Sequence, residues 1–98
     1  MPWVQVEEFA WDDENEEHVA DHGLTPRFVD QILDDDYLVD WNRQGRRAIY
    51  LLVGRDYGGR CITVAIEGTT DPQRWRPVTA WPSKPSEEAR LRQQRRHR

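Results

Sequence analysis

The sequence predicts one α+β domain in which helices pack on one face of an antiparallel β-sheet. Three observations predict this class. A length of 98 residues fits a single domain, two segments with helix-capping residues occur early in the chain, and residues 37–81 contain short apolar runs separated by turn signals. The expected order is β-α-α-β-β-β-β-α. The domain is expected over residues 1–85, followed by a basic C-terminal helix or tail over residues 86–98 that is partly frayed.

The amino-terminal part of the chain predicts a strand followed by two helices. Apolar and polar side chains alternate over Val4–Phe9, as they do in a strand. An acidic helix is expected over Asp12–His22, because an aspartate at position 12 or 13 can cap its start and Gly23 is a typical stop. Thr25-Pro26 then favours the start of a short second helix. Its apolar stripe comprises Phe28, Val29, Ile32 and Leu33.

The chain from residue 37 to residue 81 predicts a meander of four strands. Asn42-Arg43-Gln44-Gly45 and Asp56–Gly59 are turn signals between apolar runs. Pro77 has no N–H to give to a strand ladder, so we expect an edge or a bulge there. The expected strands are Tyr37–Trp41, Arg47–Val53, Arg60–Glu67 and Trp75–Trp81.

Charge is divided unevenly along the chain. Residues 1–40 hold thirteen acidic residues and one basic residue, whereas residues 41–98 hold five acidic and thirteen basic ones. The net charge of −4 therefore combines −12 in the first part with +8 in the second. The ordinary consequence is ion pairing between the helices and the sheet. The functional consequence is a basic sheet surface that attracts an anionic partner.

The cellular context is predicted from a few negative features. Cys61 is the only cysteine, so we expect no internal disulfide and no cysteine-rich zinc site. The longest uncharged apolar run, about Ala48–Gly54, is too short to cross a bilayer, and residues 1–8 lack the features of a signal peptide. These features predict a cytoplasmic protein that does not enter a membrane.

Two histidines lie four residues apart on the acidic helix. Together with Glu14, His18 and His22 have a spacing that can bind a metal, but no third strong ligand accompanies them. We therefore expect no metal and no other cofactor. His22 precedes Gly23 at the end of the helix, where the helix dipole favours a charged imidazole. It is either a structural cap or a proton donor.

Arginines flank the turns between successive strands. The Arg46-Arg47 pair is expected to meet Arg74 and Arg76 at one end of the sheet. Arg55 and Arg60 close a hairpin at the other end. Guanidinium groups gathered on one face bind phosphate, although pairing with the acidic half is the commoner outcome for a single arginine. Nearby aromatic residues either stack on bases or belong to the core, and they are Trp41, Tyr50, Tyr57, Trp75 and Trp81.

With the elements in this order, a series of short motifs covers nearly the whole chain. They are Trp11-Asp12, His22-Gly23-Leu24, Phe28–Leu33, Gly45-Arg46-Arg47, Val53-Gly54-Arg55, Gly59-Arg60, Arg76–Ala80 and Glu87–Arg90. Together these motifs resemble the BrnT-type toxin family of bacterial type II toxin–antitoxin systems. That family has a fold similar to the RelE-like ribonucleases, and the chain resembles a divergent member of it.

The resemblance implies metal-independent cleavage of RNA through attack by its own 2′-hydroxyl. His22 is the implied acid or base, and Glu88 is a weaker acid–base or orienting group. Arg46 and Arg76 would stabilise the charge that develops on the phosphate. The implied substrate-binding residues are Arg47, Arg55, Arg60 and Trp81. The implied partners are RNA and an antitoxin of the ribbon-helix-helix type.

Several departures from the family pattern favour a second hypothesis. Asp21 stands where the family has a basic residue, and Trp81 stands where an arginine follows the alanine of the last strand. The first helix is one residue shorter than in the family and is acidic. The alternative function is therefore that of a catalytically inactive protein of the same fold, which binds a partner protein.

Overall fold

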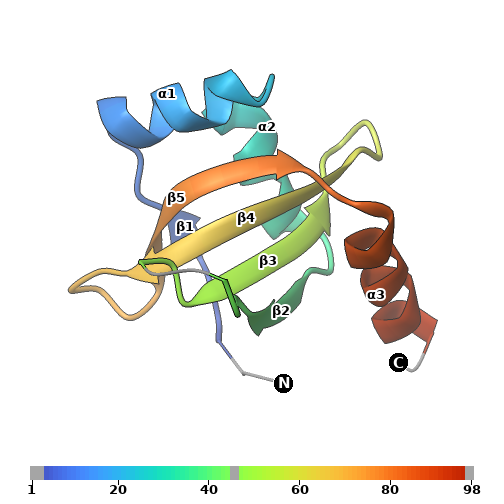
Figure 1. Ribbon diagram of the computed structural model, residues 1–98. Coiled ribbons are helices and arrows are strands. Elements are labelled where there is room, and N and C mark those ends of the chain that lie inside the picture. The colour runs from blue at the N-terminus through green and yellow to red at the C-terminus, as the bar shows by residue number, and fades with distance from the viewer. Residues whose placement is uncertain (1–3, 45–46, 97–98) are drawn as a thin grey trace.

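The computed structural model describes residues 4–44 and 47–96 and has the predicted α+β class and order of elements (Figure 1). Within these residues five strands form one sheet in the order β1-β5-β4-β3-β2. The strands are β1 (Glu8–Phe9), β2 (Leu38–Trp41), β3 (Tyr50–Arg55), β4 (Cys61–Gly68) and β5 (Arg74–Pro82). The helices are α1 (Asp13–Asp21), α2 (Pro26–Gln31) and α3 (Pro85–Arg96), with a short 3₁₀ helix, η1 (Ile32–Asp34), after α2.

The sheet is mixed, so the prediction of a purely antiparallel sheet was wrong. Strands β2 to β5 form the expected antiparallel meander, but β1 runs parallel to β5. In this pair Glu8 lies opposite Arg74 and Phe9 lies opposite Trp75. No hairpin joins β1 to β5, so no turn dictates the direction of β1. Alternation of apolar and polar residues predicts a strand, but it does not indicate whether the strand pairs parallel or antiparallel to its neighbour.

Local signals determine the helix ends as predicted. The side chain of Asp12 accepts a hydrogen bond from the N–H of Asn15 at 2.9 Å, and Asn15 Oδ1 accepts one from the N–H of Asp12 at 2.8 Å. This reciprocal pair is a capping box for α1. Gly23 follows α1 with a φ of +75°, a conformation that favours glycine. Thr25 caps α2, and Pro26 is its first residue.

Helices α1 and α2, with η1, cover one face of the sheet and bury most of the core there. Val19, Val29 and Ile32 from these helices are fully buried. They pack against alternate residues of the two central strands, which are Leu52, Ile62, Val64 and Ile66. Gly54 lies so close to η1 that a Cβ atom at this position would stand 2.9 Å from the Cβ of Ile32.

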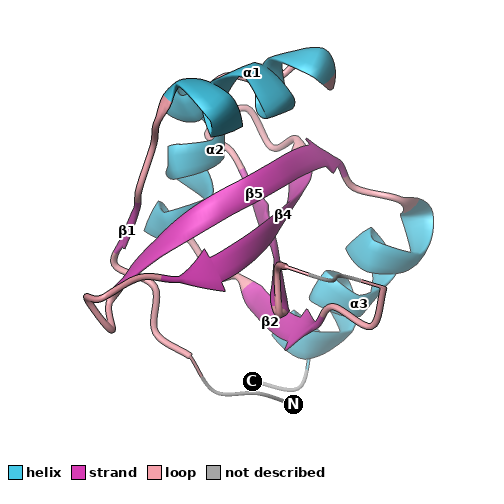
Figure 2. Cartoon of the chain, turned by 60° about the vertical axis from the view of Figure 1, so that its left-hand side comes forward, coloured by secondary structure: helices cyan, strands magenta, loops and turns pink. Residues whose placement is uncertain are grey.

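Helix α3 packs against the opposite face, which corrects the prediction that all helices share one face (Figure 2). Leu91 is fully buried and clusters with Leu38, Val53 and Cys61. These three residues alternate with strand residues that face α1 and α2, so their side chains point the other way. Most of α3 is polar, and its sequence pattern therefore did not indicate which face the helix would cover.

A bulge interrupts β5 where Pro77 occurs. Ala65 lies opposite Thr79, but the next residue, Ile66, lies opposite Pro77, so Val78 is an extra residue in β5. The irregularity predicted from the proline is therefore confirmed. It is a bulge rather than an edge, because β5 is an inner strand with β1 and β4 on its two sides.

Side chains from α1 bind the backbone at this bulge. Asn15 Nδ2 donates to the carbonyl oxygens of Ala10 and Pro77, each at 2.9 Å, and the side chain of Asn15 is fully buried. One turn later, His18 Nδ1 lies 3.0 Å from the carbonyl oxygen of Val78. The bulge thus fixes the position of α1 on β5.

Ion pairs join the acidic first part of the chain to the basic second part. This confirms the predicted pairing of helices with the sheet. The pairs that cross between the two parts are Arg47–Glu14, Arg74–Glu8, Arg76–Asp12, Arg76–Glu14 and Arg90–Asp40.

Candidate functional site

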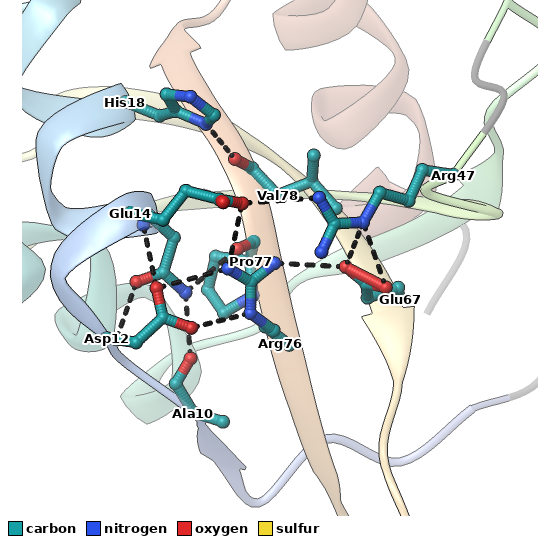
Figure 3. Close-up of polar contacts among 10 residues, drawn as sticks. Ala10, Asp12, Glu14, His18, Arg47, Glu67, Arg76, Pro77 and Val78 are labelled. Atoms are coloured by element: carbon teal, nitrogen blue, oxygen red, sulfur yellow. Dashed lines mark hydrogen bonds and ion pairs between the residues drawn. The ribbon is translucent and has the colours of Figure 1, made fainter.

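Arg76 on β5 lies at the centre of a group of carboxylates beside the start of α1 (Figure 3). Its Nε atom lies 2.7 Å from Asp12 Oδ2, and its Nη2 atom lies 3.2 Å from Glu14 Oε1. Its Nη1 atom lies 3.0 Å from Glu67 Oε2 on β4. Only 17% of the Arg76 side chain is exposed, so this arginine is largely enclosed by its partners.

Arg47 shares two of these carboxylates but remains open to solvent. Its Nη1 atom lies 3.2 Å from Glu14 Oε1, and its Nε atom lies 2.9 Å from Glu67 Oε2. The side chain of Arg47 is 55% exposed. The structure therefore brings Arg47 and Arg76 together at one end of the sheet. Exposed ion pairs contribute little stability, so Arg47 can exchange a carboxylate for another anion at small cost.

A hollow of about 340 Å³ lies beside Arg47. Its lining residues are Asn42, Gln44, Arg47, Ala48, Ala65, Val78, Thr79 and Trp81. Ala65 lies between Val64 and Ile66, which face α1 and α2, so the hollow opens on the opposite face of the sheet. We call it the open-face hollow. In Figure 1 the front of β4 and β5 to the left of α3 carries no helix of the described residues.

Trp81 lines the open-face hollow and is held in place by α3. Its indole Nε1 donates to Glu87 Oε1 at 3.1 Å. The same carboxylate oxygen accepts hydrogen bonds from Thr63 Oγ1 at 3.0 Å and from the backbone N–H of Lys84 at 2.8 Å. The indole is partly exposed. A fixed, partly exposed indole is a surface on which a nucleotide base can stack.

Glu14 and His18 project from the same side of α1 toward this region. They are one helical turn apart. Glu14 binds both arginines, and His18 binds the carbonyl of Val78, which lines the open-face hollow. The sequence pattern grouped these two residues with His22 only as a metal spacing. It did not indicate that Glu14 would contact the arginines or that His18 would contact Val78, because both contacts join parts of the chain that are distant in sequence.

The predicted catalytic residue His22 is not part of this cluster. His22 is exposed and caps the C-terminal end of α1. Asp12, which binds Arg76, caps the N-terminal end of the same helix. A helix of nine residues is roughly 13 Å long, so His22 lies a full helix length from the cluster. Arg46 lies outside the described residues.

Three other predicted site residues form ion pairs near the β3–β4 hairpin. Arg55 Nη2 lies 3.1 Å from Glu88 Oε1 and so connects β3 to α3. Arg60 Nε lies 3.2 Å from Asp56 Oδ2, and its guanidinium carbon lies 5.2 Å from the centre of the Phe28 ring. The structure therefore does not bring Arg55, Arg60 and Glu88 to the open-face hollow.

The arginines keep the carboxylates of the cluster ionised. The hydrogen bond from Arg76, together with the backbone N–H of Asn15, lowers the pKa of Asp12 to about 2. Hydrogen bonds from Arg47 and Arg76 lower the pKa of Glu14 in the same way. Glu14 is therefore a carboxylate at neutral pH, and losing an arginine partner would raise its affinity for a proton.

The lowered pKa of Asp12 predicts a loss of stability in acid. A carboxyl whose pKa falls from 3.8 to about 2 on folding stabilises the fold above about pH 4, and this contribution is lost as the pH falls through about 2. At pH 6, Asp12→Asn is expected to have a lower urea midpoint than the unaltered protein. Between pH 6 and pH 2, the midpoint of the variant should fall by less than that of the unaltered protein. Urea midpoints of both proteins from pH 6 to pH 2 test this, and parallel curves would contradict it.

A second, acidic hollow of about 590 Å³ lies between β1, α2 and the β3–β4 hairpin. We call it the acidic groove. It is lined by Glu7, Glu8, Phe9, Arg27, Asp30, Gln31, Leu33, Asp34 and Tyr57. Burial raises the pKa of Asp30, and a hydrogen bond from the indole Nε1 of Trp11 at 2.8 Å opposes this effect. Four of the residues that line the groove carry carboxyl groups, and one is an arginine.

No protein-family model matches the chain, and no curated protein matches it significantly. Within residues 4–44 and 47–96, no group of three or more His, Cys, Asp and Glu side chains is placed to hold a metal ion. In the same part of the chain, no helix is both long enough and apolar enough to cross a membrane. Fold and site together define an α+β domain with an arginine–carboxylate cluster beside a hollow on its open sheet face.

Proposed function

We propose that the chain is a divergent BrnT-like protein of RelE-like fold that binds RNA on its open sheet face and cleaves it. The observation that carries this proposal is the meeting of Arg47 and Arg76 beside a hollow that Trp81 also lines. Cations for the phosphates and an aromatic ring for a base are what proteins use to bind single-stranded RNA. The observed order of elements also supports the proposal.

The two arginines have different roles in this proposal. Arg76 has three carboxylate partners and is mostly covered, so it positions the cluster and supplies positive charge beside the phosphate. Arg47 is half exposed and lines the hollow, so its planar guanidinium is available for two parallel hydrogen bonds to a phosphate. The incoming phosphate replaces Glu14 and Glu67 on Arg47.

Arg47→Gln is expected to weaken the binding of single-stranded RNA by about 10- to 100-fold, because a charge-assisted phosphate contact is lost. It should also reduce the slope of the logarithm of affinity against the logarithm of salt concentration by about one, which corresponds to the loss of one phosphate contact. Fluorescence anisotropy with a labelled oligonucleotide that has 2′-fluoro sugars measures both effects without cleavage.

Arg74→Gln is the matched control for this experiment. Arg74 is also exposed and paired with a glutamate, Glu8, at 3.3 Å, but it does not line the open-face hollow. The variant makes the same change in net charge and should bind RNA nearly as well as the unaltered protein. Equal losses in the two variants, or no binding by the unaltered protein, would show that the open face is not the RNA site.

A second candidate function is partner binding without catalysis, which the acidic groove favours. Its four carboxyl groups suit a basic segment of a protein such as a ribbon-helix-helix antitoxin. The adjacent gene product, co-expressed with the chain, is the partner to test. If it co-purifies with the chain, if Asp34→Asn weakens the complex, and if purified chain leaves RNA intact, the partner-binding function is supported instead.

A further inference from the structure

We propose that Glu14 and His18 are the base and the acid for RNA cleavage at the open face. This assignment rests on the proposed function and adds the residues that move protons. From the sequence, neither residue was predicted to be catalytic, and His22 was the predicted acid or base instead. The structure favours Glu14 because its carboxylate contacts Arg47, and it favours His18 because its ring contacts the carbonyl of Val78, another residue that lines the hollow. His22 lies at the far end of α1.

The hydrogen bond of His18 prepares its ring for proton donation. A backbone carbonyl can only accept a hydrogen bond, so Nδ1 of His18 carries a hydrogen atom when it binds Val78 at 3.0 Å. Nε2 has no hydrogen-bond partner within residues 4–44 and 47–96 and is free to meet a substrate. The ring is therefore held by one nitrogen and available through the other, as in histidines that act as acids and bases.

A structural role accounts poorly for His18. Asn15 already binds α1 to the bulge through the Pro77 carbonyl, and Asn15 is fully buried. His18 lies on the exposed side of the helix, where a hydrogen bond to the backbone adds little stability. Glu14 is also 56% exposed, although it makes two ion pairs.

The two residues complete a balanced transfer reaction. Glu14 takes the proton of the 2′-hydroxyl while the 2′-oxygen forms a bond to phosphorus. The bond from phosphorus to the 5′-oxygen breaks. His18, which carries a proton on each ring nitrogen before this step, gives its Nε2 proton to that oxygen and keeps its Nδ1 hydrogen, which binds Val78. The products are a 2′,3′-cyclic phosphate and a 5′-hydroxyl. Arg47 and Arg76 stabilise the negative charge on the phosphate oxygens throughout.

Substrate binding itself would prepare Glu14 for this step. In the free protein, Glu14 shares its oxygen with Arg47 and Arg76, and these arginines lower its pKa. A phosphate that takes over the N–H groups of Arg47 leaves Glu14 with one arginine instead of two. The affinity of the carboxylate for a proton then rises at the moment when a base is needed.

An RNA substrate with sulfur in place of the bridging 5′-oxygen tests the role of His18 directly. A thiolate leaves without a proton, so loss of the acid should not slow cleavage of this substrate. His18→Asn keeps a donor for Val78 and is expected to cleave ordinary RNA about 10²- to 10⁴-fold more slowly. It should cleave the sulfur substrate at nearly the unaltered rate and bind 2′-fluoro RNA normally.

Glu14→Gln tests the base in the same assay. It should slow both substrates by a similar factor, because both need the 2′-hydroxyl proton removed. Glu16→Gln is the matched control, since Glu16 is an exposed glutamate on the same helix, and it should leave both rates unchanged. Urea denaturation of each variant at neutral pH shows whether the fold is retained.

The outcomes separate the assignment from the proposed function. If the unaltered protein cleaves neither substrate, both fail. If it cleaves RNA but His18→Asn slows the ordinary and sulfur substrates equally, His18 is not the acid and the assignment is overturned. If His22→Asn rather than His18→Asn shows the selective loss with ordinary RNA, the acid is His22. In these last two cases the proposed function still stands.

Discussion

Replacing Asn15 with alanine is expected to destabilise the folded chain by about 3 kcal/mol. The amide of Asn15 donates to the carbonyls of Ala10 and Pro77, and its oxygen accepts from the N–H of Asp12. All these contacts surround a fully buried side chain. Alanine would leave two carbonyls and one N–H without their partners, and each loss costs about 1 kcal/mol or more.

The change at Asn15 is measured as the free energy of unfolding from urea titration at neutral pH. Glu17→Ala is the matched control, because Glu17 is exposed on the same helix, and it should change this free energy by less than about 0.5 kcal/mol. If Asn15→Ala behaves like Glu17→Ala, α1 is not bound to the bulge in the way the structure shows.

Leu91→Ala is expected to detach α3 from the sheet, at a cost of about 2–5 kcal/mol. Leu91 of α3 is fully buried and packs against Leu38, Val53 and Cys61. Helix α3 also makes polar contacts, which include the pair Arg55–Glu88. Polar contacts at the surface contribute little without the buried leucine, so we expect the helix to open locally before the rest of the domain unfolds.

Hydrogen exchange measured by mass spectrometry distinguishes this local opening from global unfolding. In Leu91→Ala, amides of residues 86–94 should lose protection while those of β3 and β4 keep most of theirs. Gln93→Ala, at an exposed position on the same helix, should exchange like the unaltered protein. Uniform loss of protection over the whole chain would show that α3 is part of a single cooperative unit.

The parts of the fold that depend on neighbouring residues could be predicted from the sequence. The capping residues Asp12 and Thr25, the stop at Gly23 and the alternation in β4 all act within a few residues. The direction of β1 and the face covered by α3 depend on contacts between distant segments. Both predictions were wrong for that reason.

In the candidate site, too, some contacts could be predicted from the sequence and others could not. The meeting of Arg47 with Arg76 could be expected, because both arginines flank turns at the same end of the meander, with β4 between their strands. The position of His18 could not, since it depends on which residue of β5 is the extra one in the bulge. Nor could charge patterns show that Arg55 and Arg60 would pair with Glu88 and Asp56 rather than face the hollow.

A crystal structure of the chain with a short 2′-fluoro RNA would show directly whether RNA binds at the open-face hollow. We expect a phosphate within hydrogen-bond distance of the Arg47 guanidinium, beside Arg76, with a base against the indole of Trp81. The reacting 2′ position should lie next to Glu14, and the following 5′-oxygen should lie next to His18. RNA bound at the β3–β4 hairpin or in another place away from the open-face hollow would show that this hollow is not the RNA site.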